Sequence, residues 1–218
     1  MAGILYAVGV GPGDPELLTL KAVKTIKNAD CIACLQKDGE PGIAYRIAEK
    51  AVPEISEKEI LLLDFPMRKD ELRDAHRKAA DRLMHCLSSG KNVAFLTLGD
   101  PGFYSTFYYV AGIIKEQGYG IEIVSGITSF SAASAKLQHP LSLGNGSVMI
   151  TSGNFCCFDG TLVILKAGSN LKEIKSQAAE NHKNVYMIEN CGMPDERIYN
   201  DPDLIPDEAG YFTIVIVE

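Results

Sequence analysis

Tryptophan is missing from the sequence, histidine occurs only four times, and basic residues are outnumbered by acidic ones. The 21 Lys and Arg residues against 28 Asp and Glu residues give a formal net charge of -7. Nonspecific affinity for nucleic acid comes largely from clustered Lys and Arg side chains. The charge balance therefore argues against a nucleic-acid partner, although an anionic small molecule would need only a local cationic lining.

Long apolar runs are also missing. No stretch approaches the roughly 18 consecutive apolar residues of a membrane-spanning helix, and residues 1–6 lack the basic and apolar segments of a secretory signal peptide. We therefore expect no membrane partner and a cytoplasmic location.

The sequence also lacks a recognisable set of metal ligands. Cys31 and Cys34 form a C-x-x-C pair, but no second such pair and no H-x-x-x-H pair accompanies it. Positions three apart in a strand also point to opposite faces. We therefore predict no protein-bound metal, and we interpret the cysteines as small buried residues in a reducing compartment. The histidines are scattered singly, at positions 76, 85, 139 and 182.

The first half of the chain alternates short apolar runs with helical patterns, which is typical of a parallel α/β sheet. Strands are expected at residues 4–10, 31–35, 60–63, 93–98 and 121–124, and helices at 15–28, 41–52, 69–89 and 104–117. Asp14 is placed to cap the first helix, and Pro15 suits its first position. Gly90 is placed to end the third helix.

The second half has closely spaced strands, at residues 147–151, 162–165, 185–189 and 211–217, with helices only at 129–137 and 170–181. Such spacing favours antiparallel or mixed pairing, because parallel neighbours need a crossover of about a dozen residues. The sequence therefore predicts an α/β protein of two domains, residues 1–120 with a parallel sheet and residues 121–218 with a mixed sheet.

Three glycine-containing loops follow predicted strand ends, where open parallel sheets bind ligands. They are GVGPGDPE (9–16), LGDPGFY (98–104) and SGITS (125–129), and together they predict one cleft.

An NAD-dependent oxidoreductase is the rival interpretation of the first loop. Its glycines resemble G-x-G-x-x-G, but the third comes one residue early. Pro12 removes a backbone donor, and Asp14 puts negative charge where a pyrophosphate would lie. A ligand with positive charge and hydroxyls, such as a sulfonium with an α-amino group and a ribose, fits the loop better.

At these residues the sequence resembles the tetrapyrrole methylase family, from residue 3 to the end. The segments that carry the resemblance are GVGPGDPELLTLKA, LGDPGFYSTF, IVSGITSFSAA, LVILKAG, YMIENCGMPDE and YFTIVIV. LDFPMRKD, TLGDPGFYSTF and GITSFSAA look most like the precorrin-2 / cobalt-factor II C20-methyltransferase branch. Ser125 departs from the proline that is frequent at that position.

The resemblance implies two α/β domains, a five-stranded parallel N-terminal sheet and a mixed C-terminal sheet, with the active site in the cleft between them. It also implies a homodimer and the cofactor S-adenosyl-L-methionine. The implied cofactor contacts are Pro12, Leu98, Gly99, Asp100, Phe103, Thr128, Ser129, Lys166, Cys191 and Gly192. Among them we expect the Asp100 carboxylate to face the cationic cofactor.

The implied reaction is methyl transfer to C20 of a cobalamin-precursor tetrapyrrole, with cobalt-factor II favoured over precorrin-2. Tyr104 and Asp70 are candidate bases, and Arg68, Lys69 and Arg73 are candidate ligands for substrate carboxylates. Any cobalt would belong to the substrate. The alternatives are methylation of another corrin position, of diphthine or of rRNA ribose, a module that binds the cofactor without turnover, and NAD chemistry.

Overall fold

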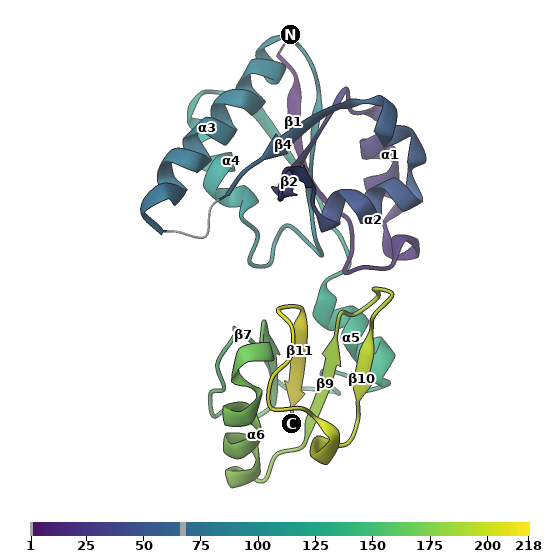
Figure 1. Ribbon diagram of the computed structural model, residues 1–218, viewed down its shortest axis with the longest axis vertical. Coiled ribbons are helices and arrows are strands. Elements are labelled where there is room, and N and C mark those ends of the chain that lie inside the picture. Colours follow the sequence, from purple (N-terminus) through teal and green to yellow (C-terminus); the bar gives the residue numbers. More distant parts are fainter. Residues whose placement is uncertain (1, 66–68) are drawn as a thin grey trace. The chain divides into compact units, whose positions relative to one another are not determined.

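The computed structural model describes residues 2–65 and 69–218, except for the side chains of residues 69–71. The chain forms two compact units that divide between Thr128 and Ser129 (Figure 1). The predicted division between residues 120 and 121 falls inside strand β6 (Gly120–Val124), which pairs along its length with β1 (Ile4–Gly9) in the first unit. Within the described residues, no helix has the length and apolar character needed to cross a membrane.

The first unit is built on a parallel sheet, as predicted. Among the described residues its parallel strands lie in the order β4 (Glu59–Leu63), β2 (Cys31–Lys37), β5 (Val93–Thr97), β1, β6. A short strand missed by the sequence analysis, β3 (Glu40–Pro41), pairs antiparallel with the end of β2. This pairing uses residues expected to begin a helix, so α2 starts later, at Ile43.

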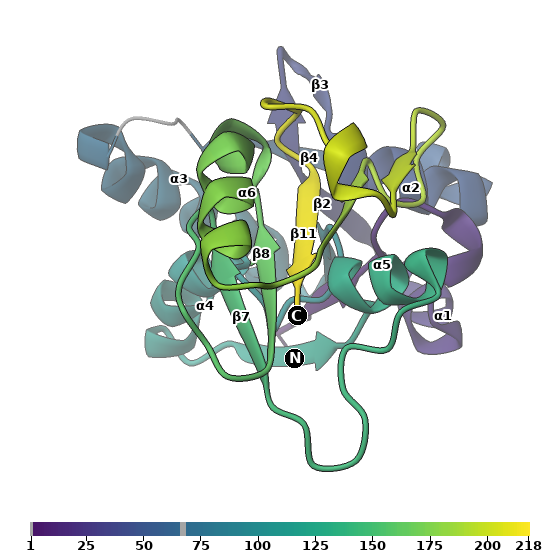
Figure 2. The same ribbon diagram turned by 90° about the horizontal axis from the view of Figure 1, so that it is seen from below.

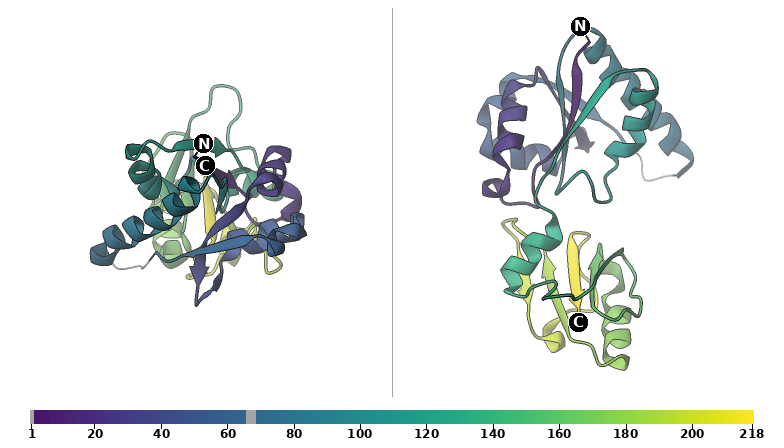
Figure 3. Two further views of the ribbon diagram at one scale, coloured as in Figure 1. Left: turned by 90° about the horizontal axis from the view of Figure 1, so that it is seen from above. Right: turned by 180° about the vertical axis from the view of Figure 1, so that it is seen from behind.

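Helices cover both faces of this sheet (Figure 3, left). Apolar residues of α3 (Lys69–Ser88) and α4 (Phe107–Glu116) pack on one face. The other face is covered by α1 (Leu20–Asn28) and α2 (Ile43–Ala51). Because strand side chains alternate, Cys31 lies in the first core and Cys34 in the second. The predicted separation of the C-x-x-C pair is confirmed.

The helix expected at residues 15–28 forms in two pieces. Asp14 does act as a cap, but of a short 3₁₀ helix (Pro15–Leu17), where its carboxylate accepts from the Glu16 N–H at 2.9 Å. Thr19 is in an extended conformation and caps α1 itself, accepting from the Ala22 N–H at 3.1 Å. The prediction of one continuous helix was wrong because a second capping residue restarts it.

The second unit has the predicted mixed sheet. Its strands lie in the order β10 (Arg197–Tyr199), β9 (Val185–Glu189), β11 (Thr213–Val217), β8 (Thr161–Leu165), β7 (Val148–Ser152). Only β7 and β8 pair in parallel among these described strands, although residues 153–160 connect them without a helix. Helix α6 (Leu171–Glu180) covers one face, and α5 (Ser129–Leu137) lies against β9 and β11 (Figure 2).

An aromatic stack joins α3 to α4 and holds a histidine whose ring is partly buried. The His76 ring lies parallel to Tyr109, with centroids 4.9 Å apart, and meets Phe65 edge-on. Within the described structure, the buried His76 Nε2 has no hydrogen-bond partner. Burial lowers the pKa of His76 below its ordinary value of 6.5.

A lowered pKa in the folded state means that the unfolded chain binds this proton first. The contribution of His76 to the free energy of unfolding is therefore complete above about pH 6.5 and is lost as the pH falls through the folded-state pKa. We expect urea denaturation at pH 7.5 and 5.5 to show a smaller acid-induced loss in His76→Phe than in the parent chain. Equal losses in the two proteins would contradict this assignment.

Candidate active site

Three loops of the first unit converge at the carboxyl ends of its strands. The loop after β1 and the loop after β5 exchange backbone hydrogen bonds: Gly99 N donates to Gly11 O at 2.7 Å, and Gly11 N donates to Gly99 O at 3.2 Å. The third loop, after β6, lies against both, since Gly9 and Gly126 are in backbone contact. The grouping of these loops, predicted from their positions after parallel strands, is what the first unit shows.

Two glycines allow this convergence because a side chain would not fit. A Cβ atom on Gly126 would lie 2.2 Å from Gly99 O and 2.9 Å from Gly9 Cα. A Cβ on Gly9 would lie 2.6 Å from Gly99 O and from Gly126 N. These glycines are therefore required for the close approach of three backbones. Neither has a positive φ, so backbone conformation is not the reason for glycine here.

Asp100 connects two of the loops through its carboxylate. Its Oδ1 accepts from Gly102 N at 2.6 Å and its Oδ2 accepts from Gly126 N at 2.8 Å. The side chain is half-buried. A carboxylate has about four acceptor positions, and these two bonds occupy one position on each oxygen. The structure thus gives Asp100 a positioning role beside the cofactor contact expected from the sequence.

The same Asp-Pro turn occurs at three places in the chain. Asp14, Asp100 and Asp201 each precede a proline, and each accepts from the N–H two residues ahead. In the described structure, Asp100 is the one of these three that also accepts from a second loop. Its special role comes from the fold and not from the local sequence.

The glycine loop after β1 leads into the short 3₁₀ helix (Pro15–Leu17) and not directly into an α-helix. In dinucleotide-binding folds the loop opens a helix whose free N–H groups hold the pyrophosphate. Here α1 begins only at Leu20, and the Thr19 hydroxyl accepts from Ala22 N and donates to Ser125 O at 3.3 Å. This capping, together with Asp14, disfavours a phosphate ligand.

The remaining first-unit candidates differ in exposure. Pro12 and Gly99 are buried, and Leu98 is half-buried against the core under α1 and α2. Phe103 and Tyr104 are 45% and 56% exposed. Tyr104 has φ 49°, in the left-handed region that few non-glycine residues adopt. Such backbone strain recurs at functional sites, so Tyr104 stays a candidate.

In the second unit, Lys166 directly follows β8 and is exposed. It has φ 55°, and its Nζ lies 5.2 Å from the centre of the Tyr211 ring, a distance at which a cation is attracted by an aromatic face. The turn at Cys191 and Gly192 follows β9, where Gly192 N donates to Glu196 Oε2 at 2.6 Å.

Burial raises the pKa of Cys191 to about 11, which keeps its thiol protonated near neutral pH. A buried, protonated thiol is a poor nucleophile. We therefore expect Cys191 to contact the cofactor through its backbone and by packing, and not through thiolate chemistry. Thr128 and Ser129, which flank the division between the units, are half-buried.

A buried polar group missed by the sequence analysis supports the turn that carries Lys166. Glu189 Oε1 accepts from Gly210 N at 2.6 Å, and Thr213 Oγ1 donates to Gly210 O at 2.7 Å. That same carbonyl oxygen would lie 2.2 Å from a Cβ on Gly168. No local sequence pattern around Glu189 predicts this contact, because Gly210, its hydrogen-bond partner, lies in another segment.

The candidates near the LDFPMRKD segment are only partly described. Arg68 lies outside the described residues, and Lys69 and Asp70 belong to the start of α3 with undescribed side chains. Arg73 is exposed on α3. The roles expected for these residues stay predictions.

Comparison with known proteins gives matches along most of the chain. Residues 4–202 match the model of the Tetrapyrrole (Corrin/Porphyrin) Methylases. A probable cobalt-precorrin-2 C(20)-methyltransferase of Methanocaldococcus jannaschii is 42% identical over 147 residues, which are 67% of this chain and 62% of that relative. A precorrin-2 C(20)-methyltransferase of Sinorhizobium sp is 29% identical over 99% of this chain and 95% of its own length.

The solved structures agree on the fold. A cobalt precorrin-4 methyltransferase superposes with a TM-score of 0.75 at 21% identity, covering 98% of this chain and 94% of the other. The chain spans 46% of the CobIJ cobalamin biosynthesis protein of Mycobacterium tuberculosis. Because the family model covers most of the residues and the loop geometry lies where that family's signature segments were recognised, the chain belongs to the tetrapyrrole (corrin/porphyrin) methylases and is a methyltransferase of that family.

Proposed function

We propose that this protein transfers a methyl group from S-adenosyl-L-methionine to C20 of a cobalamin-precursor tetrapyrrole, with cobalt-factor II favoured over precorrin-2. The observation that carries the proposal is the near full-length match to a protein named precorrin-2 C(20)-methyltransferase. The 42% identical relative is named for the cobalt-containing substrate, which supports the preference for cobalt.

The chemistry of the first-unit loops fits a cationic cofactor better than a phosphorylated one. The Asp100 carboxylate, which accepts from Gly102 and Gly126, puts negative charge among these loops. The N-terminus of α1 is capped by Thr19 and offers less to an anion. A related fold, uroporphyrin-III C-methyltransferase of Thermus thermophilus, has been solved with S-adenyl homocysteine (TM-score 0.70, 22% identity).

S-adenosylmethionine would supply an electrophilic methyl group on a sulfonium. With the cofactor bound, an electron pair of the conjugated C20 carbon would form the new carbon–methyl bond, the S–CH₃ bond pair would return to sulfur, and C20 would then lose its proton. Since the carbon is already electron-rich, the protein's main task is alignment, which can contribute roughly 7–11 kcal/mol. Among the candidate bases for the proton, Tyr104 is held in a strained, exposed loop position.

The candidate substrate-binding residues are basic because the proposed tetrapyrrole substrate carries carboxylates. Arg73 is exposed on α3, and a guanidinium can hold a carboxylate through two hydrogen bonds. We further propose a small-molecule tetrapyrrole as the partner, with a homodimer as the assembly and the second-unit residues Ser129, Lys166, Cys191 and Gly192 as cofactor contacts.

A single-turnover assay with methyl-labelled S-adenosylmethionine tests the proposal. Cobalt-factor II, precorrin-2 and uroporphyrinogen III are offered separately, and NMR locates the label in the product. We expect label at C20, faster with cobalt-factor II, and its loss in Asp100→Ala. Label on uroporphyrinogen III, or at another carbon, would assign this protein a different reaction of the family. Uroporphyrinogen III is offered because the chain is 28% identical to a uroporphyrinogen-III C-methyltransferase of Bacillus subtilis. Faster methylation of precorrin-2 would overturn the cobalt preference alone.

A further inference from the structure

A second cluster of reactive side chains lies at the opposite ends of the first unit's strands from the glycine loops. Cys31 begins β2 and Glu59 begins β4, and the parallel register pairs these two residues directly. Cys86 reaches the same place from α3. Three elements distant in sequence thus bring together two buried thiols in the core under α3 and an exposed carboxylate at its edge.

The spacing of these groups suits a shared metal ion. The Cys31 and Cys86 sulfurs are 3.9 Å apart, and one ligand atom of each of the three residues lies within 4.8 Å of the others. Two thiolates at about 2.3 Å from one tetrahedral zinc ion are about 3.8 Å apart. A disulfide requires about 2.05 Å. The two sulfurs therefore already have the separation that an ion needs, whereas a disulfide would require them to move together.

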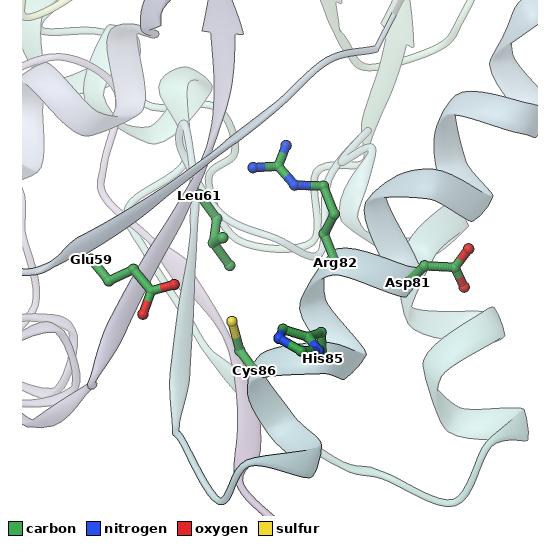
Figure 4. Close-up of a pocket in the computed structure, with 6 residues that line it drawn as sticks. All are labelled: Glu59, Leu61, Asp81, Arg82, His85 and Cys86. Atoms are coloured by element: carbon green, nitrogen blue, oxygen red, sulfur yellow. The ribbon is translucent and has the colours of Figure 1, made fainter.

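A cavity of about 310 Å³ borders two members of the cluster, Glu59 and Cys86. It is lined by Glu59, Leu61, Asp81, Arg82, His85 and Cys86. Figure 4 shows the Glu59 carboxylate and the Cys86 sulfur turned toward each other, with the His85 ring beside Cys86. An ion held by these three residues would have a fourth coordination position for water on the side of the cavity.

The surrounding charge is balanced for a divalent cation. Two thiolates, one carboxylate and a dication sum to one negative charge. Lys91 Nζ lies 2.6 Å from Glu59 Oε2 and supplies the compensating positive charge. A carboxylate that uses one oxygen for a metal and the other for a neighbouring cation is a usual arrangement around metal sites.

We propose that Cys31, Glu59 and Cys86 bind a zinc ion, with the fourth position facing the cavity. The sequence analysis predicted no protein-bound metal, since it paired Cys31 with Cys34 and found no further ligands. Glu59 and Cys86 join Cys31 only through the sheet register and the packing of α3. Binding of zinc displaces the protons of both thiols.

The test is a titration of the reduced, chelator-treated protein with Co²⁺, followed by displacement with Zn²⁺. We expect one equivalent of Co²⁺ to produce a sulfur-to-cobalt charge-transfer band and tetrahedral d–d bands, which zinc then abolishes. Cys31→Ser and Cys86→Ser should each lose at least half of the charge-transfer intensity, and Glu59→Gln should weaken zinc binding at least tenfold. Cys34→Ser is the matched control, because Cys34 is equally buried on the same strand but faces the other core.

Glu59→Gln keeps the test valid if a cysteine variant fails to fold. The Glu59 side chain is 46% exposed, so its substitution leaves the core intact. Absence of a stoichiometric cobalt band, or an unchanged band in Cys86→Ser, would overturn the site. So would zinc affinity in Glu59→Gln equal to that of the parent. If the reduced protein binds no metal but peroxide joins Cys31 to Cys86 in peptide mapping, the pair is a redox pair and the zinc proposal fails.

Discussion

Gly126→Ala is expected to lower the free energy of unfolding by about 3 kcal/mol and to abolish measurable binding of S-adenosylmethionine. The added Cβ would lie 2.2 Å from Gly99 O and 2.9 Å from Gly9 Cα. These neighbours are backbone atoms of two other loops, so they cannot rotate away as a flexible side chain does. Overpacking of this kind typically costs 1–3 kcal/mol and occasionally more, and here it also separates the loops of the proposed site.

Urea denaturation and isothermal titration with S-adenosylmethionine measure the two effects. Gly112→Ala is the control, because Gly112 lies within α4 and nothing stands within 4 Å of the position its Cβ would take. Alanine is the better helix former, so that variant should gain about 0.5–1 kcal/mol. Near-parent stability and cofactor binding in Gly126→Ala would mean that the three loops do not need their observed contact.

Asp100→Asn is expected to raise the Kd for S-adenosylmethionine at least tenfold and to lower the free energy of unfolding by about 2 kcal/mol. The carboxylate accepts from the N–H groups of Gly102 and Gly126, and hydrogen bonds to charged groups contribute about 1.5–3 kcal/mol each. An asparagine has one oxygen, so its NH₂ group must face one of these two donors. The negative charge that we assign to the cationic cofactor is lost as well.

Asp201→Asn separates the shared turn from the contact between loops. Asp201 makes the same Asp-Pro turn in the second unit, accepting from Asp203 N at 3.0 Å, and its side chain is exposed. Its substitution should cost less stability and leave cofactor affinity unchanged. Equal losses of stability in the two variants would show that the bond from Gly126 adds nothing to the turn.

Much of the local structure was predictable because short-range chemistry decides it. Short apolar runs predicted the strand positions, and Asp14 and Gly90 marked element ends. The errors came where a local signal was weak or was overridden. β3 and β10 are too short for a periodic pattern, and Thr19 interrupts a helix whose apolar residues read as continuous.

The parallel pairing of β7 with β8 could not be predicted from the length of the connection between them. A short connection normally favours an antiparallel pair, yet residues 153–160 return the chain to the same direction without a helix. Gly153 and Gly160 both have positive φ, and Gly153 N donates to Leu165 O at 2.7 Å. Strand direction thus depended on backbone conformations that spacing alone does not show.

Local sequence patterns were enough to predict two α/β units, the first with a parallel sheet and the second with a mixed sheet, and the glycine loops after β1, β5 and β6. Those properties depend on residues close together in the chain. The backbone contacts among Gly9, Gly99 and Gly126, the hydrogen bond from Gly126 to Asp100, and the grouping of Cys31, Glu59 and Cys86 could be seen only in the folded chain. Strand order and helix packing set these contacts, because they bring together atoms from segments that no local pattern relates.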